Sequence, residues 1–149
     1  MRNEYKQLKK VVESSKRILI LTHKGPDVDA FCSSLLLRQV LMEIYPKKVF
    51  TIQAKQNPSM RLPNMKEIEI VKRLDSIGYD CILITDAGDL SLCIEDDDSV
   101  NELLPTIVID HHDTFFEKRE NVTIINENMS SATEQVYMTL KKIYGRRFK

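Results

Sequence analysis

The sequence contains no tryptophan and few other aromatic residues, with five Phe and five Tyr among its 149 residues. It therefore offers no visible aromatic surface on which nucleic-acid bases would stack. Charge of one sign does not prevail either, because 22 basic and 22 acidic residues give a formal net charge of zero. A partner recruited by bulk charge, such as long nucleic acid or an anionic membrane surface, is not indicated.

Cysteines are few, and long apolar runs are missing. Cys32, Cys81 and Cys93 are odd in number and form no CxxC pair, so we expect small buried thiols and neither disulfides nor zinc ligands. No apolar run approaches the roughly 18 residues that a membrane span needs. No hydrophobic signal core follows the basic amino terminus. We expect one cytoplasmic domain without a membrane partner.

Apolar periodicity predicts helices that alternate with strands. Helices are expected over 4–15, 30–45 and 65–74, and from the capping box Ser131-Ala132-Thr133-Glu134 onward. Strands are expected over 17–21, 48–54, 81–85, 106–109 and 122–125, with Pro58 and Pro63 in a loop after the second strand. This alternation predicts an α/β fold in which helices on both sides flank a mostly parallel sheet.

Acidic and histidine residues follow three of the predicted strands directly. They are His23, Asp27 and Asp29 after 17–21, Asp86 after 81–85, and Asp110, His111 and His112 after 106–109. The carboxyl ends of strands are where open α/β sheets bind ligands. Imidazole and carboxylate together are ligands of Mn²⁺, Fe²⁺ or Zn²⁺. If the three strand ends converge, the sequence predicts a hydrolytic metal site.

Some of these residues also have ordinary structural explanations. Asp29 lies where the following helix is expected to begin, and Asp is a good N-cap. Asp27 follows the turn residues Gly25 and Pro26, where an Asx-turn is common. Neither explanation accounts for His23 at the end of a strand. The acidic run 95–98 is most simply a solvated loop, because no histidine or strand end frames it.

The paired histidines are harder to explain by packing alone. Consecutive side chains of an extended segment point to opposite sides, so one of His111 and His112 can face a metal while the other faces a substrate. Asp110 would hold an imidazole nitrogen from behind. The four carboxylates at these strand ends would repel one another if left empty. Two divalent ions ~3.5–4 Å apart would neutralise them, with one carboxylate bridging the ions.

The same residues resemble, in order and spacing, the four motifs of the DHH phosphoesterase family. The matching segments lie between about residues 15 and 145 and are His23-Lys24-Gly25-Pro26-Asp27-Val28-Asp29-Ala30, Asp86, Asp110-His111-His112 and Ser130-Ser131-Ala132-Thr133-Glu134. The combination is highly specific, although each motif alone is not. The resemblance implies a manganese-dependent phosphoesterase with a parallel α/β fold.

The resemblance also implies a role for each residue of these motifs. His23 and Asp27 would bind one Mn²⁺, and Asp29 and His111 would bind the other. Asp86 would bridge the two ions. His112 would contact substrate phosphate, and Asp110 would support the site.

The chain departs from the family pattern at three places. Gly25 replaces the usual Asn, and Leu92 stands where many members have Arg. Family members also continue beyond this point with a further metal-binding Asp and a second, substrate-gripping domain. We therefore expect residues 1–149 to be a single catalytic domain without that second domain. One of the two Mn²⁺ positions should then be weaker, unless Asp113 or Glu134 substitutes for the missing ligand.

The resemblance implies a manganese-dependent phosphoesterase, and with no basic excess to bind long nucleic acid we expect small nucleotides or short oligonucleotides as substrates, with pyrophosphate or polyphosphate as the alternative. A competing hypothesis is a metal-occupied module that binds a nucleotide or a partner chain with weak turnover or none. A plain structural domain is the third, and metal content would distinguish it from the others. Homo-oligomerisation stays open.

Overall fold

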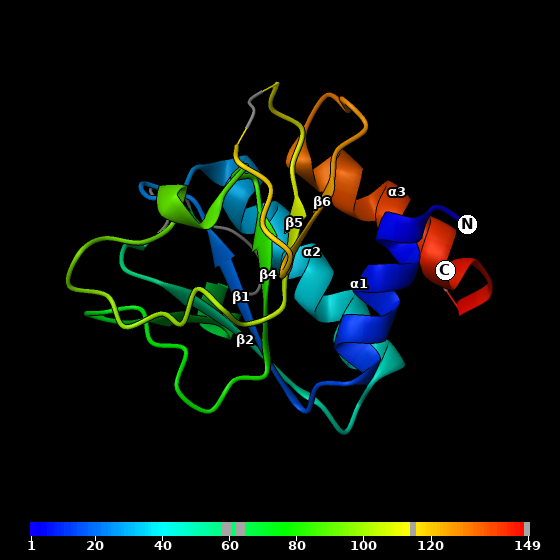
Figure 1. Ribbon diagram of the computed structural model, residues 1–149. Coiled ribbons are helices and arrows are strands. Elements are labelled where there is room, and N and C mark those ends of the chain that lie inside the picture. Colours follow the sequence, from blue (N-terminus) through cyan, green and yellow to red (C-terminus); the bar gives the residue numbers. More distant parts are fainter. Residues whose placement is uncertain (58–60, 62–64, 114–115, 148–149) are drawn as a thin grey trace.

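The computed structural model describes residues 1–57, 61, 65–113 and 116–147. Six strands form one sheet in the order β3-β2-β1-β4-β5-β6, and every neighbouring pair is parallel (Figure 1). They are β1 Arg17–Thr22, β2 Val49–Ala54, β3 Ile68–Ile70, β4 Cys81–Thr85, β5 Thr106–Ile109 and β6 Val122–Ile125. The predicted parallel α/β sheet is confirmed.

The strand order reverses between β1 and β4, in the middle of the sheet. After β1 the chain adds β2 and β3 on one side, and then returns to add β4, β5 and β6 on the other. The crevice at the carboxyl end of such a switch point is the usual ligand site of open α/β sheets. Thr22 and Thr85 end the two central strands in register, and the Thr22 hydroxyl donates to the Thr85 carbonyl at 2.7 Å. The residues that follow each strand therefore start from adjacent points.

Three α-helices, α1 Asn3–Glu13, α2 Val28–Ile44 and α3 Ala132–Tyr144, pack against the same face of the sheet (Figure 1). On that face Leu8, Phe31 and Val136 belong to one apolar cluster with Ile18 and Leu83 of the strands. Among the described residues, the cluster on the opposite face draws its members from strands and from the segments 71–79 and 87–104. The prediction of helices on both sides is therefore wrong, because these polar, turn-rich connections cover the second face.

The helix predicted over 65–74 is also wrong. A 3₁₀ helix, η1 Met65–Glu67, leads directly into β3, where Ile68 pairs with Ile52 of β2. Two β-branched residues beside an open strand edge favour pairing over a weak helical pattern. Pro58 and Pro63, expected in the preceding loop, lie outside the described residues. Within the described chain no helix combines the length and apolarity needed to cross a membrane.

Candidate metal centre and active site

The first motif forms a turn between β1 and α2. Gly25 adopts φ +62°, a left-handed conformation that glycine accepts without steric cost. Asp27 is the N-cap of α2, where its Oδ1 accepts the backbone N–H of Ala30 at 2.9 Å. The helix therefore begins at Val28, earlier than predicted, and the capping role considered for Asp29 belongs to Asp27.

Asp29 lies in the first turn of α2 and contacts the N-terminus of α3. Its Oδ1 accepts the Thr133 hydroxyl at 2.7 Å and the Thr133 amide at 3.0 Å, while Oδ2 accepts the Ala132 amide at 2.9 Å. Burial alone would raise the pKa of Asp29, but these three hydrogen bonds outweigh it and lower the pKa. The Asp29 carboxylate is thus fixed by hydrogen bonds that favour its ionised form. Its Oδ2 lies 3.6 Å from Nε2 of His111.

Asp86 is the centre of the site. Its side chain is 3% exposed, and its backbone adopts φ +60°, a left-handed conformation that is uncommon for a residue with a Cβ. Its two carboxylate oxygens face different imidazoles, with Oδ2 3.3 Å from His23 Nε2 and Oδ1 3.2 Å from His111 Nε2. Burial and the negative charge of Asp29 raise the pKa of Asp86 to about 6. A positive charge placed here would relieve that electrostatic cost.

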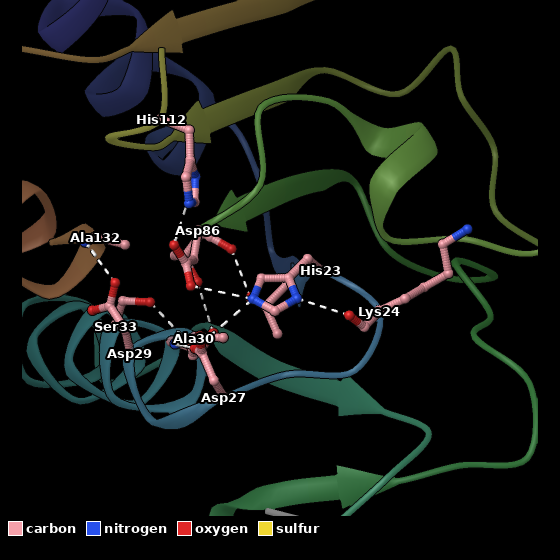
Figure 2. A network of polar contacts seen from close by, with 12 residues as sticks. His23, Lys24, Asp27, Asp29, Ala30, Ser33, Asp86, His112 and Ala132 are labelled. Carbon is pink, nitrogen blue, oxygen red and sulfur yellow. Dashed lines mark hydrogen bonds and ion pairs between the residues drawn. The ribbon is translucent and has the colours of Figure 1, made fainter. Parts of the chain in front are cut away.

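A hydrogen bond from Nδ1 sets the orientation of the His23 ring. Nδ1 lies 2.8 Å from the Lys24 carbonyl, which can only accept a hydrogen bond, so Nδ1 carries the proton. Nε2 is then directed at Asp86 and at Asp27 Oδ1, 3.8 Å away, as Figure 2 shows. Metal-binding histidines generally donate their second nitrogen to a carbonyl or carboxylate in this way.

His111 and His112 do not point to opposite sides, so the predicted alternation is wrong. Both follow the end of β5, outside any strand, and their ring centroids are 4.2 Å apart. His112 Nδ1 lies 2.7 Å from Oδ1 of the buried Asp110 and 3.9 Å from Oδ1 of Asp86. Partial burial would lower the pKa of His112, but the hydrogen bond to Asp110 and the surrounding carboxylates raise it. Asp110 thus holds His112 in its half-exposed position.

The donor atoms gather into two groups that could each hold a metal ion, and both contain Asp86. One group is His23, Asp27 and Asp86, and the other is Asp86, Asp110, His111 and His112. Asp29 belongs to neither, although it lies beside His111. A mixed imidazole and carboxylate set with a shared, buried carboxylate suits divalent ions such as Mn²⁺, Fe²⁺ or Zn²⁺. The seven residues that the sequence singled out therefore lie together at one site.

Several contacts at this site were not visible in the sequence. The Thr133 hydroxyl and the amides of α3 hold Asp29, and only the fourth motif hinted that this segment matters. At Gly88 an added Cβ would lie 2.8 Å from the Phe116 ring and 3.3 Å from Oδ2 of Asp110, so a larger residue here would require the Phe116 ring to shift. Leu92, in the position where Arg was expected, lines the mouth of the site.

The two substitute ligands considered from the sequence do not join either metal group among the described residues. Glu134 instead accepts the amide and the hydroxyl of Ser130, at 3.2 and 3.3 Å. Asp113 is exposed after the paired histidines.

The acidic run 95–98 is only in part the solvated loop that was predicted. Asp98 has a fully buried side chain that contacts the Lys55 ammonium at 2.7 Å and accepts the amides of Leu74 and Glu95. Through these contacts Asp98 holds residues 95–98 against the carboxyl end of β2.

Comparison with known proteins identifies the fold and the family. The family model described as DHH family, N-terminal domain, matches residues 17–149. The fold is similar to that of an exopolyphosphatase-related protein from Bacteroides fragilis, with a TM-score of 0.78 at 22% sequence identity. The match covers 98% of this chain and 45% of that protein's chain. No curated protein matches the sequence significantly. Because the family model spans all six strands of the sheet and every motif residue at its carboxyl edge, the chain belongs to the DHH family.

Proposed function

We propose that this chain is a phosphoesterase that depends on two divalent ions, Mn²⁺ in preference, and acts on small nucleotides or short oligonucleotides. One observation carries the proposal. Asp86 is a buried, backbone-strained carboxylate whose two oxygens each face an imidazole from a different strand end. Strained residues cluster at functional sites, and a carboxylate shared in this way is the expected bridge between two ions.

The remaining ligands divide between the two positions. His23 and Asp27 would hold the first ion, and Asp29 and His111 the second, with Asp86 common to both. The ions would activate water and stabilise the charge that develops on phosphoryl oxygens. Both oxygens of Asp29 already accept hydrogen bonds, which leaves it less free to adjust, and we expect the second position to be the weaker.

His112 is assigned to substrate. Because Nδ1 is occupied by Asp110, the outward nitrogen is Nε2, and the raised pKa of His112 favours the form that carries a proton there. A protonated imidazole at the half-exposed edge of the site would donate to a phosphate oxygen. Asp110 would act through His112 by keeping the ring in this orientation.

Pyrophosphate or polyphosphate is the second substrate class. It is favoured by the fold shared with a protein described as exopolyphosphatase-related. The non-catalytic module is the other candidate, and it differs from both enzymatic proposals in holding metal and nucleotide without turnover.

The test begins with protein stripped of metal by EDTA and reloaded with Mn²⁺. Thermal unfolding should shift upward with Mn²⁺, because a ligand that binds only the folded state stabilises it. Hydrolysis of a diadenylate, of adenosine 3′,5′-bisphosphate and of pyrophosphate is then followed by phosphate release and chromatography. We expect weak Mn²⁺-dependent hydrolysis of the nucleotides, which Asp86→Ala abolishes.

The outcomes separate the candidates. Faster hydrolysis of pyrophosphate than of either nucleotide would favour the polyphosphate class. Two bound ions without hydrolysis of any substrate would favour the binding module. The absence of any Mn²⁺-dependent shift in unfolding temperature would contradict the metal centre itself.

A further inference from the structure

A cavity of about 220 Å³ opens beside His23, on the side of the site that faces β2. Its floor is apolar, since Ala54, Leu74 and Cys93 are 5%, 3% and 2% exposed. His23 and Lys24 line both this cavity and the mouth of the metal centre. The cavity and the mouth of the metal centre therefore adjoin each other at these two residues.

The size of the cavity limits what it can hold. Pockets that enclose a whole ligand usually measure about 300–1,000 Å³. A cavity of about 220 Å³ is smaller than that, so it accommodates one portion of a ligand. Its apolar floor favours a portion with apolar faces, because burial of polar groups without partners is costly.

The charges around the cavity are mixed, because Lys24 and Lys55 are cations and Glu95 is an anion. The Lys55 ammonium is already paired, with Asp98 Oδ1 at 2.7 Å and Glu95 Oε2 at 3.3 Å. Glu95 also lines the cavity and would repel an anion. Among the described residues that line the cavity, the Gln56 amide and the Lys24 ammonium offer hydrogen bonds to a neutral ligand. Figure 2 shows the Lys24 side chain extending away from Asp86.

We propose that this cavity binds the nucleobase of a nucleotide whose phosphate lies at the metal centre. The base would lay its apolar faces against Ala54, Leu74 and Cys93, and turn its polar edge to Gln56 and Lys24. This inference rests on the proposed phosphoesterase function and narrows its substrate class. Pyrophosphate and polyphosphate carry no group suited to this cavity, so nucleotides are the preferred substrates.

Titration calorimetry in the presence of Mn²⁺ tests the proposal with AMP, ribose 5-phosphate and inorganic phosphate as probes. AMP should bind about tenfold more tightly than ribose 5-phosphate, a difference of about 1.4 kcal/mol. Equal affinities for AMP and ribose 5-phosphate would overturn the base site and leave the phosphate site standing. If none of the three probes binds, the proposed function fails together with this inference.

Two variants locate the base. Ala54→Val adds two methyl groups at a buried position of the cavity floor, so its folding is checked by thermal unfolding. Gln56→Ala removes a polar partner from an exposed position, where folding is not at risk. Each should bring the affinity for AMP toward that of ribose 5-phosphate, without changing the affinity for ribose 5-phosphate.

The matched control is Gln39→Ala, the same substitution at an exposed position of α2 that does not line the cavity. It should leave both affinities unchanged. If AMP keeps its advantage in both cavity variants, the base binds elsewhere and the proposal is wrong.

Discussion

Replacing Asp86 by Asn should make the metal-free protein more stable at neutral pH, although the same change destroys the proposed metal centre. Asn is nearly the same size as Asp, and both tolerate a left-handed backbone better than other residues with a Cβ. The substitution therefore removes the charge of Asp86 and preserves its conformation at φ +60°.

The magnitude follows from the pKa of this carboxyl. Burial, followed by the charge of Asp29, raises the pKa of Asp86 from 3.8 to about 6. A shift of roughly two units is worth about 3 kcal/mol. The folded state binds the Asp86 proton more tightly than the unfolded state does. Protonation of Asp86 therefore stabilises the folded state, and this contribution is fully present below pH 3.8. It is lost as the pH rises through about 6.

Urea unfolding of metal-free protein measures this effect between pH 4 and pH 7.5. The parent and Asp86→Asn should have similar free energies of unfolding at pH 4. At pH 7.5 the variant should be more stable by about 3 kcal/mol. Asp96→Asn, at an exposed carboxylate outside the site, is the matched control and should behave as the parent does. A variant no more stable than the parent at pH 7.5 would refute the reasoning that Asp86 carries an uncompensated buried charge.

Other predictions concern the contacts around Asp86. Thr133→Val should weaken Mn²⁺ binding about tenfold in calorimetry, because the Asp29 carboxylate loses its hydroxyl partner, whereas Thr133→Ser should retain the affinity. His112→Ala should impair turnover in the Mn²⁺-dependent assay and leave Mn²⁺ affinity nearly intact. Loss of the metal would show that the division of roles between the paired histidines is wrong. Asp98→Asn should destabilise the protein by about 1–3 kcal/mol at pH 7 in urea unfolding. Burial alone would raise the pKa of Asp98, but its contacts with Lys55 and backbone amides lower it. The loss of stability in the variant should therefore shrink as the pH falls below 3.8.

Much of this protein is determined by local sequence. The runs 81–85, 106–109 and 122–125 form strands with the predicted bounds. The first two are fully buried, as continuous branched apolar residues predict, whereas 122–125 is a partly exposed edge strand. The site could be located for a related reason. His23, Asp86 and Asp110 each follow such a run directly, and parallel strands bring their carboxyl ends to one edge.

The tertiary structure alone decided which partner each of these side chains meets. Asp29 is fixed by Thr133, more than one hundred positions away, and a short sequence pattern carries no information about such a contact. The same holds for β3, where pairing with β2 prevailed over a helical pattern. The face of the sheet covered by 71–79 and 87–104 is likewise a result of packing. Hydrophobic periodicity reports that a surface is buried, whereas the identity of what buries it depends on how distant segments meet.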